Sequence, residues 1–203
     1  PLVGANGRMG YDQCSLVLAL NFSVTWTSLL ASWAHRSHIH LMPEPHILAA
    51  ILWALILAGA GGALTSIGPW YRNLKKPSWQ PPDWLFGPAW TLILSSAAWA
   101  AILAWEGASS RSDQMIVIGL YAANFVFHFA WSPLFFALKR PDWALKESFF
   151  LWGSVVALCV GVLPYSALAS ALLVPYVLWV TFATYLNYTI VKLNGPFQSP
   201  ASP

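Results

Sequence analysis

Aromatic side chains and prolines are concentrated between Trp70 and Trp90, in the stretch WYRNLKKPSWQPPDWLFGPAW. Trp and Tyr rings stack on flat apolar ligands, and they also favour the headgroup zone of a bilayer. Pro77, Pro81 and Pro82 exclude a regular helix, because proline fixes φ and lacks an amide proton. The composition predicts a structured interfacial loop. Two roles stay open for it: an aromatic belt or a dedicated binding site.

Polar side chains within apolar runs form a second group of candidate ligand contacts. Asn124, His128 and Trp131 follow one another at steps of four and three residues, and Phe135 continues the same helix face. Amide and imidazole groups are costly at membrane depth and usually face the interior of a bundle. For Asn124 and His128, a hydrogen bond between helices and a contact to a ligand are both open.

Conventional catalytic and metal-binding patterns do not appear in the sequence. There is no nucleophile–base pair, zinc motif or phosphate-binding loop, and Cys14 and Cys159 show no metal or redox spacing. Four histidines lie in a short loop without cysteine or a convincing carboxylate set, which favours a solvated loop over a metal site. These are His35, His38, His40 and His46. We therefore expect no metal site and no required cofactor.

The composition is that of an integral membrane protein. Hydrophobic residues make up 58% of the chain and charged residues only 8%, whereas soluble domains carry about 25% charged residues. The net charge of +3 is modest and the basic residues fall in loops, so the sequence does not show the basic patch typical of a nucleic-acid-binding protein. The partner that this composition predicts is the lipid bilayer.

Five apolar runs are long enough to cross a bilayer as helices, which predicts an all-α five-helix bundle. They are Ile47–Ile67, Phe86–Trp105, Met115–Leu138, Phe149–Leu163 with its flanks, and Leu168–Val191. Small residues at Ala58–Ala63 favour close approach of helices. Pro133 should loosen the third helix, and Pro175 should kink the fifth. Between spans we expect a polar loop at Glu106–Gln114 and a charged turn at Lys139–Glu147.

The two ends of the chain fall outside this five-helix domain, which we place at residues 46–194. Residues 1–45 contain the apolar run Cys14–Ala34, for which three interpretations are open: a sixth helix, a signal sequence, or a dispensable extension upstream of a start at Met42. Residues 195–203 are expected to be a disordered tail.

Basic residues set the expected orientation. One side of the five-helix layout carries most of them, and the positive-inside rule then places the Trp-rich loop and the C-terminus in the cytoplasm. That side holds Arg72, Lys75, Lys76, Lys139, Arg140, Lys146 and Lys192, against Arg36 and Arg111 on the other. The membrane itself is either a bacterial envelope membrane or an organelle membrane.

Three stretches in order resemble the translocator protein family, also called tryptophan-rich sensory proteins. They are WYRNLKKPSWQPPDWLFGPAWT at Trp70–Thr91, GLYAANFVFHFAWSPLFFALKR at Gly119–Arg140, and VPYVLWVTFATYLNYTIVKLN at Val174–Asn194. With the spacing of the apolar runs, the resemblance covers Ile47 to Asn194. His128 departs from the pattern, which more often has Asn there, so the ligand preference is expected to differ and to gain pH sensitivity.

The resemblance implies a ligand class and an assembly. Such proteins bind tetrapyrroles, notably protoporphyrin IX and other haem precursors, and some bind sterols and isoquinoline-type ligands; a homodimer is implied too. With Asn124 and His128, the implied ligand-binding positions are Tyr71, Trp79, Trp84, Trp90, Trp131, Trp143, Trp179 and Ala183. Trp90 and Trp179 match a pair linked to light-dependent porphyrin degradation, which leaves catalysis or oxidative damage open.

A sterol-contact pattern and three function classes complete the sequence-based expectations. Leu186, Tyr188 and Lys192 fit the pattern L-x-Y-xxx-K, which many membrane helices match by chance. The favoured function is a receptor or sensor that binds tetrapyrroles and regulates or handles porphyrin. The alternatives are a porphyrin or sterol transporter and an enzyme that degrades porphyrin in light; an enzyme is the less favoured.

Overall fold

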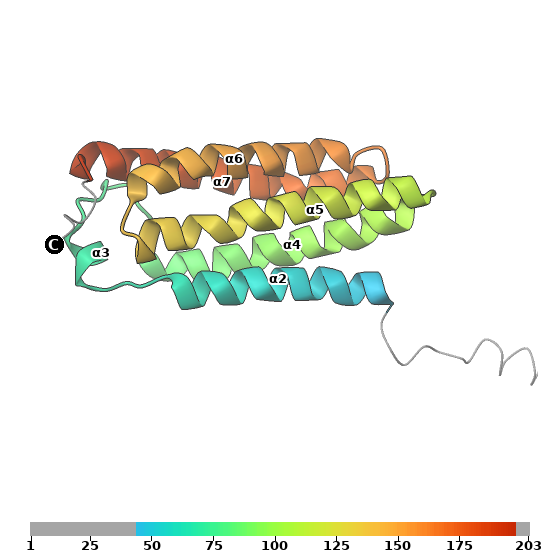
Figure 1. Cartoon of the computed structure of the whole chain (residues 1–203), viewed down its shortest axis with the longest axis horizontal. Coiled ribbons are helices and arrows are strands. Elements are labelled where there is room, and N and C mark those ends of the chain that lie inside the picture. Colours follow the sequence, from blue (N-terminus) through green and yellow to red (C-terminus); the bar gives the residue numbers. More distant parts are fainter. Residues whose placement is uncertain (1–43, 198–203) are drawn as a thin grey trace, which may run out of the picture. The chain divides into compact units, whose positions relative to one another are not determined.

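The computed structural model describes residues 44–197, and most of this part of the chain forms a helical bundle (Figure 1). Within it, five helices are long and apolar enough to cross a bilayer. They are α2 (Pro45–Leu64), α4 (Phe86–Gly107), α5 (Arg111–Ser132), α6 (Pro141–Gly161) and α7 (Ala167–Asn194). The predicted all-α five-helix membrane bundle is confirmed.

Some predictions fall on residues outside this range. They are the apolar run Cys14–Ala34, the start at Met42 and the last part of the tail, residues 198–203. These stay predictions.

Prolines and a capping side chain fix where several helices begin. Pro45 and Pro141 are the first residues of α2 and α6, where a missing amide proton costs nothing. At the start of α5, Ser110 Oγ accepts a hydrogen bond from the Asp113 backbone N at 3.1 Å, and the Asp113 carboxylate accepts one from the Ser110 backbone N at 3.3 Å. This capping box satisfies two amide protons that a helix start otherwise leaves without partners.

These helix starts correct two predicted connections. The loop expected at Glu106–Gln114 is reduced to residues 108–110, because α4 continues to Gly107 and the capping box draws residues 111–114 into α5. The charged turn expected at Lys139–Glu147 is mostly the first turns of α6, which starts at Pro141. Charge alone therefore did not mark the ends of these helices.

Pro133 changes the geometry of the third span as expected. Residues Pro133–Ala137 form a π-helical turn, η2, in which the Leu138 backbone N donates to the Pro133 carbonyl at 2.9 Å. Proline cannot donate the usual intrahelical bond, and insertion of one residue in the turn accommodates this. The turn places Phe135 among the buried residues at this end of the bundle.

Close helix packing uses small residues on α4. Ala97, Ala100 and Ala104 are fully buried in the core cluster. A Cβ added at Gly107 would collide with the Tyr165 carbonyl, so the approach of the 162–166 turn to α4 requires glycine there. The stretch Ala58–Ala63 was predicted to pack closely within the bundle or between protomers. Within this single chain a Cβ added at any of its glycines meets nothing within 4 Å, and packing between protomers stays a prediction.

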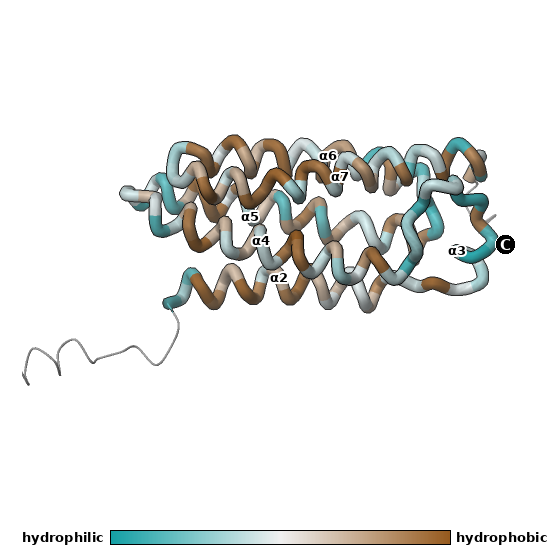
Figure 2. Tube along the Cα trace, turned by 180° about the vertical axis from the view of Figure 1, so that it is seen from behind, coloured by the Kyte–Doolittle hydropathy of each residue, from teal (hydrophilic) through white to brown (hydrophobic). Residues whose placement is uncertain are grey.

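The connection from α2 to α4 covers one end of the bundle. It contains the short helix α3 (Pro69–Asn73) and the 3₁₀ turn η1 (Asp83–Leu85). Figure 1 shows α3 at the same end of the bundle as the C-terminal end of α7, and Figure 2 shows hydrophilic positions gathered at this end. The Trp- and Pro-rich stretch is therefore a loop at an end of the bundle, where a membrane–water boundary is expected.

Candidate ligand-binding cavity

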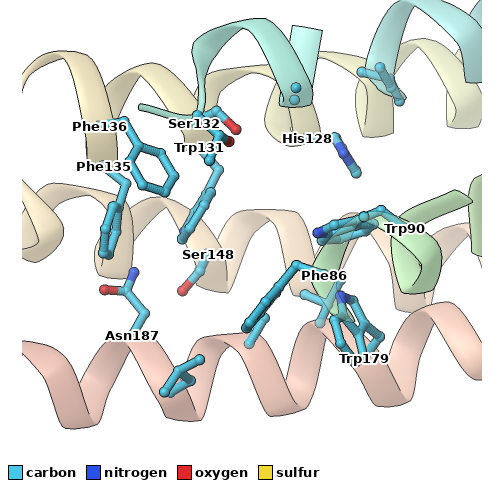
Figure 3. A pocket seen from close by; sticks show the side chains of 18 of the residues that line it. Phe86, Trp90, His128, Trp131, Ser132, Phe135, Phe136, Ser148, Trp179 and Asn187 are labelled. Carbon is cyan, nitrogen blue, oxygen red and sulfur yellow. The ribbon is translucent and has the colours of Figure 1, made fainter. Parts of the chain in front are cut away.

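A cavity of about 460 Å³ lies inside the bundle, next to the end that the loop covers (Figure 3). This volume is within the range of about 300–1,000 Å³ for small-molecule sites. All five long helices contribute side chains to its lining. They include Leu57 and Gly61 from α2, Phe86 and Trp90 from α4, His128 and Trp131 from α5, Ser148 from α6, and Trp179 and Ala183 from α7.

Aromatic rings form two walls of the cavity. On one side, the Trp90 and Trp179 rings meet edge to face with centroids 6.1 Å apart, and Phe86 packs on Trp179 at 5.7 Å. On the other side, Trp131 stacks on Phe135 at 5.0 Å. Edge-to-face and stacked rings hold one another in place. The walls are therefore suited to a flat ligand that lies between rings.

Polar side chains also line the cavity, among them Thr65, Asp83 and Asn187. Among the described residues, Trp179 Nε1 and Thr184 Oγ1 are buried without a hydrogen-bond partner, and both residues line the cavity. A buried donor left without a partner costs about 1–3 kcal/mol. A ligand carbonyl or carboxylate that accepts from these donors would remove this cost.

A hydrogen-bonded network joins three helices behind the cavity. His128 Nδ1 lies 2.6 Å from the Tyr176 hydroxyl oxygen, and Tyr176 donates to Asn124 Oδ1 at 3.2 Å. Asn124 Nδ2 donates to Ser154 Oγ at 3.0 Å. Asn124 is fully buried and does not line the cavity, so its contacts are between helices, whereas His128 bonds to Tyr176 and also lines the cavity.

Tyr71 lines the cavity at its loop end. Its hydroxyl donates to Asp83 Oδ1 at 3.0 Å and accepts from Gln80 Nε2 at 3.2 Å, and Lys76 Nζ lies 3.7 Å from its ring centre. Burial, together with the neighbouring Asp83 carboxylate, raises the pKa of Tyr71 to about 12. The hydroxyl is therefore neutral at physiological pH and holds the loop as a hydrogen-bond donor.

The same loop is fastened to the end of α7. Asn194 Oδ1 accepts from the Lys75 backbone N at 2.7 Å, and Asn194 Nδ2 donates to the Lys75 carbonyl at 2.8 Å. Trp79 stacks on Tyr185 with centroids 5.3 Å apart. The loop thus has a defined position over the cavity although most of it is not helical.

The candidate ligand-binding residues from the sequence divide into two groups. Those that line the cavity are Tyr71, Trp90, His128, Trp131, Trp179 and Ala183. Asn124, Trp79, Trp84 and Trp143 are not among the lining residues. Trp84 is 71% exposed, and Trp143 packs its ring on the Arg140 guanidinium at 4.6 Å. These exposed rings suit a membrane boundary.

The sterol-contact pattern is divided between two faces of α7. Leu186 is buried and lines the cavity, whereas Tyr188 and Lys192 are exposed and do not. Residues two apart on a helix point in nearly opposite directions, while residues four apart share a face. One sterol on the outer surface would contact Tyr188 and Lys192 but not Leu186.

Several lining and supporting residues were not singled out from the sequence. Phe86 lies one turn before Trp90, and Tyr176 lies one turn before Trp179, so helical spacing from each Trp was a usable signal. Ser148 and Leu57 carry no such signal, because they face the cavity through the packing of α6 and α2.

These features define the class: a multi-pass membrane protein with an aromatic cavity inside a five-helix bundle and a Trp- and Pro-rich loop at one end. The chain belongs to the TspO/MBR family, whose sequence profile matches residues 47–193. The resemblance predicted from the three motifs is confirmed.

Relatives come from animals and bacteria. The chain is 36% identical to the translocator protein of Homo sapiens over 126 residues, which are 62% of this chain and 75% of that protein. It is 39% identical to protein CrtK of Rhodobacter capsulatus over 160 residues, 76% of this chain and 96% of that protein. It is also 37% identical to the tryptophan-rich sensory protein of Cereibacter sphaeroides over 152 residues, 70% and 92% of the two chains.

Proposed function

We propose that the protein is a membrane receptor or sensor that binds a tetrapyrrole such as protoporphyrin IX within the bundle. The observation that carries the proposal is the cavity of about 460 Å³ with Trp90, Trp179 and Trp131 in its walls. A porphyrin is flat and largely apolar, so it gains contact area from rings on both faces. Its carboxylates would accept hydrogen bonds from Trp179 Nε1 and Thr184 Oγ1, which lack partners among the described residues.

Fluorescence titration tests this proposal directly. Purified full-length protein in detergent is titrated with protoporphyrin IX, and the Trp emission is followed. We expect saturable quenching, with Ala183→Phe weakening it. Quenching that rises without saturation, and equally in both proteins, would contradict a defined site.

Light-dependent degradation of porphyrin is the second candidate function. It is favoured by the contact between Trp90 and Trp179, since these two oxidisable rings lie together in the cavity wall. Sterol binding and transport of porphyrin or sterol are less specifically supported. Loss of porphyrin over several light-driven turnovers with intact Trp would select the enzyme, and flux into liposomes would select the carrier.

The proposal includes an orientation and an assembly. The bundle end with α3 and the C-terminus holds Arg72, Lys75 and Lys76, whereas Arg111 is the basic residue at the start of α5 on the opposite side. The positive-inside rule favours a cytoplasmic position for the loop. A homodimer rests on family resemblance alone, and cross-linking in native membranes tests it.

A further inference from the structure

The hydrogen-bonded network fixes the tautomer of His128, because the Ser154 and Tyr176 hydroxyl groups in it each have a single proton to donate. Ser154 Oγ donates to the Leu151 carbonyl at 2.7 Å, so it accepts from Asn124 Nδ2, and this fixes which end of the Asn124 amide is oxygen. That oxygen accepts the single hydroxyl proton of Tyr176. The Tyr176 oxygen can then only accept at its 2.6 Å contact with His128, so Nδ1 of His128 carries the proton.

The other imidazole nitrogen is therefore a lone-pair donor. With the proton on Nδ1, the neutral ring has an unprotonated Nε2, for which the described residues offer no hydrogen-bond partner. His128 lines the cavity, and its ring centre lies 4.8 Å from that of Trp90. Figure 3 shows the His128 ring pointing from α5 toward Trp90. A ligand at this wall thus meets a nitrogen that can accept a hydrogen bond or bind a metal.

The arrangement resembles the support of a metal-binding histidine. Such residues donate their second ring N–H to a fixed partner, which sets the tautomer and orients the ring. Here the partner is Tyr176, itself fully buried and held by Asn124. A single histidine in apolar surroundings is also the usual axial ligand of haem iron.

A bare metal ion is a poor occupant of this site. The described part of the chain contains no group of three His, Cys, Asp or Glu side chains that could hold one. An iron porphyrin needs less from the protein, because the macrocycle supplies four nitrogens and leaves an axial position open. The aromatic walls at Trp90 and Trp131 suit the faces of the same macrocycle.

We propose that His128 Nε2 is the axial ligand of an iron-containing tetrapyrrole in the cavity, and that the protein discriminates haem-type ligands from metal-free porphyrin through this bond. The inference rests on the proposed function, since it requires that a tetrapyrrole occupies the cavity. To the proposed function it adds the atom that binds the iron, His128 Nε2, and a preference for haem over metal-free porphyrin of the same shape.

Absorption spectroscopy of the full-length protein with ferric haem and with protoporphyrin IX tests the inference. We expect wild-type protein to give the spectrum of imidazole-ligated iron, and His128→Ala to lose it with a loss of haem affinity of more than about tenfold. His128 lines the cavity, so the affinity for protoporphyrin IX should also fall in this variant, but by a smaller factor than the affinity for haem. Added imidazole should restore the ligated spectrum in His128→Ala.

Two further variants separate ligation from packing. Tyr176→Phe keeps the ring but removes the acceptor for Nδ1, so we expect weaker haem binding and an altered spectrum while protoporphyrin IX binding is kept. His46→Asn is the matched control, because His46 stacks on Trp105 and does not line the cavity. It should leave both ligands unaffected.

The outcomes distinguish the inference from the proposed function. If wild-type protein binds neither tetrapyrrole, both fail. If it binds both but the haem spectrum shows no nitrogen ligand, or His128→Ala retains that ligand, the inference is overturned and the proposed function stands. Should His128→Ala fail to fold, Tyr176→Phe decides: an unchanged haem spectrum and haem affinity in that variant overturn the inference.

Discussion

The Trp90 ring, from α4, meets the Trp179 ring, from α7, at an interplanar angle of 84°. Both residues line the cavity, so a ligand that touches one wall of it touches an oxidisable pair. We expect Trp90→Phe, Trp179→Phe and the double variant to keep porphyrin affinity to within about 1.5 kcal/mol, because a ring remains to stack. Photochemical loss of porphyrin should fall sharply, because Phe is far harder to oxidise.

The measurement is porphyrin absorbance under constant illumination, with affinity determined separately in the dark. Trp99→Phe is the matched control, since Trp99 also lies on α4 but is 57% exposed and outside the cavity lining. Unchanged porphyrin loss in the double variant would exclude Trp90 and Trp179 as the reactive pair.

Filling the cavity should weaken binding without unfolding the protein. Ala183 lines the cavity, so Ala183→Phe occupies ligand space, and we expect porphyrin affinity to fall by about 1–3 kcal/mol, in line with overpacking costs in cores. Ala122→Phe, at an exposed position of α5, is the control. Equal affinities of the two variants for protoporphyrin IX would argue against a ligand beside Ala183.

Gly107 should be intolerant of a side chain. Because a Cβ there would collide with the Tyr165 carbonyl, we expect Gly107→Ala to lower the thermal stability in detergent by more than about 1 kcal/mol. Gly153→Ala on α6 is the matched control, since nothing lies within 4 Å of its added Cβ. It should be neutral or stabilising by about 0.5–1 kcal/mol, the usual gain for alanine within a helix. The prediction fails if both variants melt alike.

Alkaline pH should loosen the loop at Tyr71. The pKa of Tyr71 is about 12 in the folded protein, above the ordinary value of 10.0. A group whose pKa rises on folding contributes stability that is complete below its unfolded pKa and is lost as pH rises through its folded pKa. The stability advantage of wild-type protein over Tyr71→Phe should therefore be constant below about pH 10 and shrink toward pH 12.

Thermal melts of the two proteins across this pH window give that difference. An absorbance titration near 295 nm, wild type minus Tyr71→Phe, reports the ionisation itself. A constant stability difference up to pH 12 would show that the Tyr71 hydroxyl does not hold the loop.

The helices and their inner faces were predictable because helical periodicity relates positions in a simple way. Spacing put His128, Trp131 and Phe135 on one helix face, and the structure brings all three to the cavity. The family resemblance supplied Trp90, Trp179 and Ala183, which also line it. The motif match added Tyr71, which no periodicity marks. The same match also added Trp143, which the structure places on Arg140 and outside the cavity.

Other features depend on contacts that the local sequence does not encode. The bonds of Gln80 and Asp83 to Tyr71 arise in irregular backbone, where no periodic rule orients a side chain. The protonation of His128 follows from partners on α6 and α7, so it needed the tertiary structure. The small residues of α2 were assigned to packing within the bundle or between protomers. Within this single chain a Cβ added at Gly59, Gly61 or Gly62 meets nothing within 4 Å, and Gly61 borders the cavity, so packing between protomers stays a prediction.

The two hydrogen bonds between Asn194 and Lys75 join segments 119 residues apart in the chain. They attach the loop to the last residue of α7, so the loop stays bound to the bundle at Lys75 while both bonds are formed. If a ligand leaves the cavity past this loop, loss of these two bonds should shorten its dwell time. Asn194 would then affect ligand release although it does not line the cavity.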